Sequence, residues 1–198
     1  MNMNAYDFDK TIYRRDSTVG FYLWCVRRYP RVMLRWPELI GNAVLYRLKK
    51  ISKHVFMERF YQYLHDVKDV RAEVERYWDA HEADMHGWYG TVQREDDILI
   101  SASPLFLIAP IAGRLGIKHV LASPLNPDTG LYEGERCHGE GKVRALLAAY
   151  PGAEIEDFYS DSQSDTPMAR LARRAYLVEG ERLTDWPVSK AAGKDGGE

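Results

Sequence analysis

The sequence has few of the residues that hold disulfide-stabilised or zinc-stabilised domains together. Only two of its 198 residues are cysteines, Cys25 and Cys137, and they form no Cys-x-x-Cys pair. Disulfide scaffolds and zinc sites use more cysteines at closer spacing, so both are excluded and a reducing compartment is expected. The six histidines form no metal-ligand motif either.

Long apolar runs are also missing. The most apolar stretch, residues 19–48, is interrupted by Arg27, Arg28, Arg31 and Arg35, whereas a membrane span needs about 20 nearly uninterrupted apolar residues. The opening MNMNAYDFDK lacks the basic start and apolar centre of a signal peptide. We therefore expect a cytoplasmic protein, with one alternative. The Trp, Tyr and Arg residues of 21–53 suit a helix in peripheral contact with the inner face of the membrane.

An excess of positive charge is absent as well. The formal net charge is −2, and no nucleic-acid-binding motif is present, so nucleic acid is not expected as a partner. The charges are unevenly distributed: residues 1–70 hold 13 Lys and Arg against 7 Asp and Glu, and the remainder carries a net −8. The length suits one catalytic domain with an insertion. Two structural parts with different roles are therefore expected.

The hydrophobic pattern predicts an α/β fold. Residues from about 17 to 89 read as helices, because apolar residues recur at three and four positions. Beyond residue 97, the apolar runs 98–100 and 119–122 alternate with helical stretches at 105–115 and 142–149. This alternation indicates a Rossmann-like parallel sheet. Ser103 is interpreted as the N-cap of the helix from 105, and residues 188–198 are predicted to be disordered.

The first candidate for chemistry is the pair Asp7 and Asp9 in DFDKT, directly after the opening strand. Ligands of open α/β sheets bind beyond the carboxyl ends of the strands. Two carboxylates two positions apart in such a loop can serve as a nucleophile and as a general acid and base. The alternative is a pair of turn-forming aspartates.

Three further groups follow other predicted strands or begin a helix. Ser101 ends the strand at 98–100 and can bind a phosphoryl oxygen. Lys142 stands at a predicted helix start and can offset the negative charge of a phosphate and its nucleophile. Asp161 and Asp165 in SDSQSD supply hard oxygen ligands of the kind that suit Mg²⁺.

These four groups, in this order, resemble the four motifs of the haloacid dehalogenase superfamily. The helical insertion after the first motif is similar to the C1-type cap of the phosphoserine phosphatase-like branch. The segments CHGEGK and YSDSQSD look closest to phosphatidylglycerophosphatase C-like phosphatases. The resemblance implies a catalytic core of residues 1–15 and 91–187 with a helical cap of residues 16–90.

The resemblance also implies roles. Asp7 is expected to form a phosphoaspartate, Asp9 to protonate the leaving alcohol and then activate water, and Lys142 to stabilise the phosphoryl group. Thr11 and Ser101 are expected to contact the phosphoryl oxygens. The reaction implied is hydrolysis of a phosphomonoester, because dehalogenases of this superfamily usually lack the second aspartate.

Mg²⁺ is the implied cofactor. The expected metal residues are Asp7, Asp9 through its backbone carbonyl, Asp161, and Asp165, which orients this shell directly or through water.

Substrate recognition is expected to involve the cap side of the site. Asp16 stands where phosphoserine phosphatases hold an acidic residue, and it is equally well read as a helix N-cap. Arg14 is close enough in sequence to approach an anionic substrate. The substrate class stays open between a small-molecule phosphate ester and a lipid phosphate. Phosphotransfer to another acceptor and a non-catalytic binding module that keeps the fold are further alternatives, and the oligomeric state is open.

Overall fold

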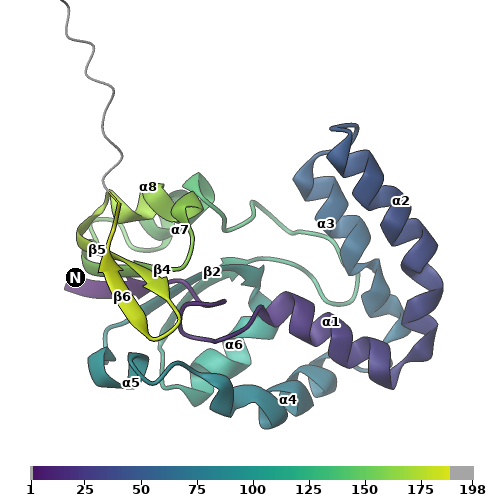
Figure 1. Ribbon diagram of the computed structural model, residues 1–198, viewed down its shortest axis with the longest axis horizontal. Helices are drawn as coiled ribbons and strands as arrows, with labels where there is room; N and C mark the ends of the chain where they lie inside the picture. The colour runs from purple at the N-terminus through teal and green to yellow at the C-terminus, as the bar shows by residue number, and fades with distance from the viewer. Residues whose placement is uncertain (1, 188–198) are drawn as a thin grey trace, which may run out of the picture.

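A six-stranded sheet between two layers of helices forms the body of the protein (Figure 1). The computed structural model describes residues 2–187, so the expected disorder of 188–198 lies outside the described residues. The strand order is β3-β2-β1-β4-β5-β6. Strands β1 to β5 pair in parallel and β6 pairs antiparallel with β5. The strands are β1 (Asn2–Tyr6), β2 (Ile98–Pro104), β3 (His119–Ser123), β4 (Glu154–Ser160), β5 (Ala172–Glu179) and β6 (Arg182–Asp185).

Each central strand sends alternate side chains to opposite faces of the sheet, as the two-residue period of a strand requires. Tyr6 and Leu99 belong to one buried cluster, with α4 (Val70–His81), α5 (Tyr89–Val92) and α6 (Leu105–Arg114). Ala5 and Ile98 belong to a second cluster, with α7 (Glu140–Ala149) and α8 (Thr166–Ala169). Both faces are therefore covered, which confirms the α/β prediction.

The long insertion between β1 and β2 is helical, as predicted. It begins with α1 (Ser17–Arg28), a 3-10 helix at Pro30–Arg35, α2 (Trp36–Arg47) and α3 (Lys53–Tyr61). Figure 1 shows α2 and α3 standing to one side of the sheet, with α1 leading toward them. Two short 3-10 helices at Gln62–Asp66 and Glu82–Asp84 flank α4, and a third at Gln163–Asp165 precedes α8.

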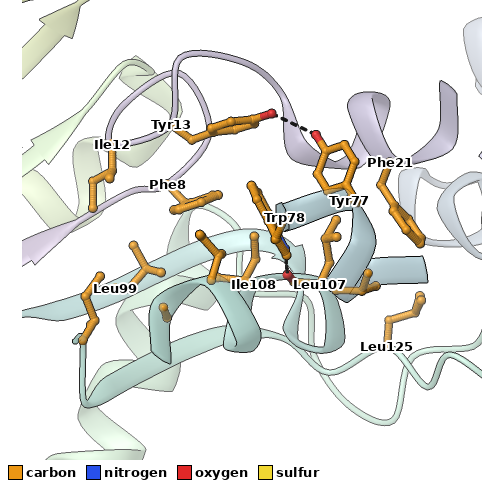
Figure 2. Close-up of a cluster of buried hydrophobic side chains, with 14 of the residues drawn as sticks. Phe8, Ile12, Tyr13, Phe21, Tyr77, Trp78, Leu99, Leu107, Ile108 and Leu125 are labelled. Carbon is orange, nitrogen blue, oxygen red and sulfur yellow. Dashed lines mark hydrogen bonds between the residues drawn. The ribbon is translucent and has the colours of Figure 1, made fainter. Parts of the chain in front are cut away.

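The later part of the insertion packs directly on the body of the protein. The indole Nε1 of Trp78 in α4 donates to the carbonyl of Leu107 in α6 at 2.7 Å, and its ring meets Phe8 edge-on (Figure 2). The hydroxyls of Tyr13 and Tyr77 lie 2.9 Å apart. The division at residues 16–90 stays a prediction. The structure adds that α4 shares its core with the sheet.

Candidate active site

The carboxyl ends of β1 and β4 lie next to each other, so the loops that leave them meet. Tyr6 is in register with Tyr159, and the N–H of Asp7 donates to the carbonyl of Tyr159 at 2.9 Å. Asp7 is thus the first residue beyond β1, and Asp161 is the first beyond β4. The sheet brings together Asp7 and Asp161, which are 154 positions apart in the sequence.

Lys142 lies between two of the predicted aspartates. Its Nζ donates to Oδ1 of Asp7 and to Oδ2 of Asp165, both at 2.6 Å, and all three residues are buried. Oδ2 of Asp165 also accepts the hydroxyl of Ser160 at 2.8 Å. Burial alone would lower the pKa of Lys142, but the two carboxylates outweigh burial and raise it. Lys142 is therefore a fixed positive charge.

The pKa of the Asp7 carboxyl is raised by its surroundings. Burial raises its pKa to about 7, against the opposing effect of Lys142, and the charges of Asp165 and Asp9 add to the rise. Perturbed carboxyls in a cleft are typical of functional sites. A cation beside Asp7 would restore the ionised form that nucleophilic attack requires.

Asp9 has different partners from Asp7, although only one residue separates them. Its Oδ1 accepts the N–H of Ser17 at 2.7 Å, and its Oδ2 accepts the hydroxyl of Ser103. Burial raises the pKa of Asp9 to about 6, with a smaller contribution from Asp16, while the two serines lower it. Between the aspartates and Thr11, Lys10 adopts a left-handed φ of 58°. Glycine adopts this conformation at least cost.

Ser103 was interpreted as a helix cap, and the structure corrects this. The N-cap position of α6 is Pro104, with no side-chain hydrogen bond to the helix. The hydroxyl of Ser103 instead reaches Asp9, 94 residues away in the sequence. Its position at a strand end, like that of Ser101, was the only sequence signal for a role at the site.

The two residues predicted to bind phosphate lie in different places. Ser101 lines the cleft, and its buried hydroxyl accepts the N–H of Ser103 at 3.1 Å, which leaves its proton for a ligand. Thr11 does not line the cleft. Its fully buried hydroxyl accepts the N–H of Asp161 at 2.9 Å. Thr11 therefore positions the Asp161 loop, and its expected phosphate contact stays a prediction.

The carboxylates at the strand ends suit a hard cation that takes only a few of its ligands from the protein. Within residues 2–187, no group of three His, Cys, Asp or Glu side chains converges on one metal position. The side chains of Asp9 and Asp165 have other partners. Asp9 was predicted to hold the metal through its backbone carbonyl, and Asp165 to orient the shell directly or through water, so both roles stay predictions. All four residues line the cleft, and Asp7 and Asp161 are the two predicted to bind through their carboxylates. Mg²⁺ is usually held by one or two carboxylates with waters, so these residues fit it.

The two substrate residues predicted on the cap side, Arg14 and Asp16, also lie in different places: only Asp16 lines the cleft. Arg14 lies outside the cleft, because its guanidinium donates to Glu181 at 2.7 Å and to the carbonyl of Met85 at 3.1 Å. This corrects the expectation that it approaches the substrate. Asp16 caps α1 by accepting the N–H of Val19 at 2.9 Å, and it also lines the cleft. The structure thus shows the cap role and leaves the substrate role a prediction.

A cleft of about 580 Å³ joins these groups to the inserted helices. Its floor carries the predicted catalytic residues, and its far wall is apolar, with side chains from α1, α2 and α3. Those wall residues are Val19, Leu39, Ala43, Phe56, Met57 and Phe60. The nucleophile candidate therefore faces a space that is polar on one side and apolar on the other.

Comparison with known proteins identifies the family. The sequence profile of the haloacid dehalogenase-like hydrolases matches residues 5–170. The chain belongs to this family. A probable phosphatase of Mycobacterium tuberculosis is 30% identical, across 92% of this chain and 73% of that protein.

Solved structures show the same fold. A protein of unknown function from Bordetella pertussis matches with a TM-score of 0.70 at 24% identity, covering 88% of each chain. A probable phosphoserine phosphatase from Vibrio cholerae matches with a TM-score of 0.62 at 11% identity, covering 88% of this chain and 55% of that one. These matches confirm the predicted fold. The family match and the probable phosphatase among the relatives confirm the predicted superfamily and an enzyme of the phosphatase type.

Proposed function

We propose that this enzyme hydrolyses phosphomonoesters with the help of Mg²⁺ and forms an aspartyl phosphate on Asp7. One observation carries the proposal: the two aspartates of the first motif are held by different partners. Asp7 faces Lys142, whereas Asp9 is held by Ser17 and Ser103. Two carboxyls in different environments can act as nucleophile and acid in the same reaction.

In the first step, a carboxylate oxygen of Asp7 attacks phosphorus and the bond from phosphorus to the alcohol oxygen breaks. Asp9, with its pKa raised to about 6, donates its proton to the departing alkoxide. In the second step, Asp9 takes a proton from water, the water oxygen bonds to phosphorus, and the phosphorus–Asp7 bond breaks. Phosphate leaves and both carboxyls return to their starting states.

Positive charge and hydrogen-bond donors near Asp7 offset the charge of the phosphoryl group. Lys142 supplies a buried ammonium, and Ser101 supplies a hydroxyl proton. Mg²⁺ would be held by Asp7 and Asp161, and when bound it offsets the negative charge that the phosphate adds to these carboxylates. Asp165 holds Lys142 in place, and Thr11 holds the backbone of Asp161.

The test is hydrolysis of p-nitrophenyl phosphate with Mg²⁺, with EDTA in its place, and by Asp7→Asn with Mg²⁺. The proposal predicts turnover that requires Mg²⁺ and is lost in the variant. Activity that survives in Asp7→Asn would exclude the aspartyl phosphate. A folded wild-type protein that binds phosphate esters but turns over none would favour the alternative of a non-catalytic binding module.

A second candidate, action on a lipid phosphate at a membrane surface, is favoured by the outer face of the inserted helices. Several large apolar side chains there are exposed, among them Leu34 at 79%, Ile40 at 64% and Leu48 at 61%. Arg31 and Arg47 are exposed in the same segment. Apolar residues with basic neighbours suit an anionic lipid surface. Among the described residues, no helix is long and apolar enough to cross a membrane.

This candidate is tested by sedimentation with vesicles of phosphatidylglycerol and phosphatidylcholine. It predicts binding to the anionic vesicles that weakens in salt and is lost in Leu34→Gln/Ile40→Gln. The matched control is Leu147→Gln/Leu171→Gln, which removes two exposed leucines from elsewhere on the surface. Equal recovery of both double variants with vesicles would argue against the membrane surface.

A further inference from the structure

Among the described residues, three basic side chains that line the cleft form no ion pair: Lys53, Arg136 and Lys10, which lies in the loop of the catalytic aspartates. Lys53 is the first residue of α3, and Arg136 lies in the loop before α7; both line the cleft that contains Asp7. Two other basic residues nearby have partners: Arg144 pairs with Glu135, and Arg59 donates to the side-chain oxygen of Asn42. Across residues 2–187, neither Lys53 nor Arg136 forms an ion pair with Asp or Glu.

Arg136 packs on an aromatic ring while its charge is left uncompensated. Its guanidinium lies 5.7 Å from the centre of the Tyr132 ring, and its buried Nε has no hydrogen-bond partner. Its carbonyl accepts the N–H of His138 at 2.9 Å. The same carbonyl would lie 2.3 Å from a Cβ added to Gly141. The loop is therefore packed against the helix that carries Lys142.

The positive charges of this region act on one another. The pKa of Lys53 is lowered by burial and by Arg136. The pKa of His138 is lowered by burial and then by Lys53 and Arg136. Like charges that share a partly buried space destabilise one another. A bound anion would compensate these positive charges.

The position of the pair separates it from the site of phosphoryl transfer. The reacting phosphate has its own cation in Lys142, which Asp7 and Asp165 hold at the strand ends. Lys53 instead precedes Phe56 and Met57 by one turn of α3, and both of those residues line the apolar wall. Residues three and four apart share a helix face. Lys53 therefore lies on the side of the cleft that receives the leaving group.

We propose that Lys53 and Arg136 form a second anion site, and that the substrate is a phosphomonoester whose leaving group carries a further acid. Resting on the proposed function, this inference adds the chemistry of the substrate. One cation comes from the inserted helices and the other from the loop before α7. A carboxylate or a second phosphate on the substrate satisfies both, while the carbon chain between the two acids contacts the apolar wall.

The experiment uses three families of esters with matched carbon chains of two to eight atoms: alkyl phosphates, the same esters ending in a carboxylate, and alkanediol bisphosphates. We expect kcat/KM at the best chain length to be about 10- to 100-fold higher for an acid-bearing ester than for its alkyl partner, as for a charge-assisted hydrogen bond. The carboxylate and bisphosphate arms show which acid is preferred. Comparable rates for all three families would overturn the proposal.

Variants identify the residues. Arg136→Met and Lys53→Met are expected to reduce the ratio of acid-bearing to alkyl rates toward one, and Arg136→Lys to restore part of it. The controls Arg144→Met and Lys50→Met remove basic residues that do not line the cleft, and they should keep the wild-type ratio. An equal loss on both kinds of ester would place Lys53 and Arg136 at the reacting phosphate instead.

Binding to Asp7→Asn makes this test independent of turnover. Calorimetry with the same esters should show tighter binding of the acid-bearing members, and Asp7→Asn/Arg136→Met should lose the difference. A wild-type enzyme inactive on all esters, together with this binding preference, would refute the proposed hydrolysis and keep the anion site. Equal binding of all families would refute the anion site alone.

Discussion

The Nζ of Lys142 lies 2.6 Å from Oδ1 of Asp7, and both residues are buried. A second buried carboxylate, Asp165, shares the same ammonium at 2.6 Å. Lys142 therefore compensates two largely buried negative charges. This arrangement makes stability and activity depend on one residue.

Lys142→Met is expected to abolish activity and to destabilise the protein by about 3–5 kcal/mol at pH 7.5, because it leaves two buried carboxylates unpaired. Lowering the pH should reduce this loss. Without the ammonium the folded-state pKa of Asp7 rises further, and its protonation removes the repulsion. Urea unfolding at pH 7.5 and pH 5 measures both effects. Lys118→Met, which removes an exposed pair with Glu95, is the control. A loss for Lys142→Met no larger than for this control would contradict the account.

Asp9→Asn should affect poor leaving groups most. General acids contribute about 10²- to 10⁴-fold, and an alkoxide needs the proton far more than p-nitrophenolate does. We expect a loss of that size on glycerol phosphate in a single turnover. With p-nitrophenyl phosphate, a rapid burst of nitrophenol should be followed by slow turnover, because the variant cannot activate water. If the p-nitrophenyl phosphate burst rate and the single-turnover rate on glycerol phosphate fall by the same factor, Asp9 does not act as the general acid.

Ser103→Ala should move the pH profile. The hydroxyl of Ser103 donates to Asp9 and lowers its pKa, which burial has raised to about 6. Without this hydrogen bond the pKa of Asp9 rises further, so Asp9 keeps its proton to higher pH. The alkaline limb of kcat/KM for an alkyl phosphate should shift upward. Thr184→Ala on the edge strand β6, whose hydroxyl donates to Leu177, should leave the limb in place. A limb that stays fixed or moves down in Ser103→Ala would count against this role.

Two glycines in helices make a matched pair. A Cβ on Gly141 in α7 would lie 2.3 Å from the carbonyl of Arg136, whereas a Cβ on Gly113 in α6 would have no atom within 4 Å. Gly113→Ala should stabilise the protein by up to about 1 kcal/mol, as alanine favours helices. Gly141→Ala should destabilise it and lower kcat, because α7 carries Lys142. Thermal unfolding and p-nitrophenyl phosphate kinetics measure both. If the two variants have similar stability and kcat, the loop that contains Arg136 adjusts to the added Cβ without cost, which would contradict this prediction.

The sequence predicted the parts of the site that follow from local pattern. A strand that ends in DFDKT places Asp7 at a sheet edge, and the alternation of strands and helices fixes which edge. The partners of these residues depend on distant contacts. Arg14 pairs with Glu181, 167 positions away, and Ser103 reaches Asp9 across 94. No periodicity or spacing encodes such pairs.

Partial agreement has a similar cause. Thr11 stands beside the predicted nucleophile in sequence, but its chain turns at Lys10, and its hydroxyl then meets Asp161. Asp16 could be read as a cap or as a substrate residue, and its position at the start of α1 places it both at the cap and in the cleft. Closeness in sequence therefore predicted that Thr11 and Asp16 lie near the site, but it did not predict which atoms their side chains contact.

The phosphoaspartate itself gives the most direct test of the central claim. Wild-type enzyme is mixed with Mg²⁺ and p-nitrophenyl phosphate, quenched in acid within milliseconds, and reduced with borohydride, which converts an aspartyl phosphate to homoserine. Peptide mass spectrometry then locates the modified residue. The account predicts homoserine at position 7 in the wild type and none in Asp7→Asn. Homoserine at another aspartate, or rapid turnover with no modified residue, would contradict it.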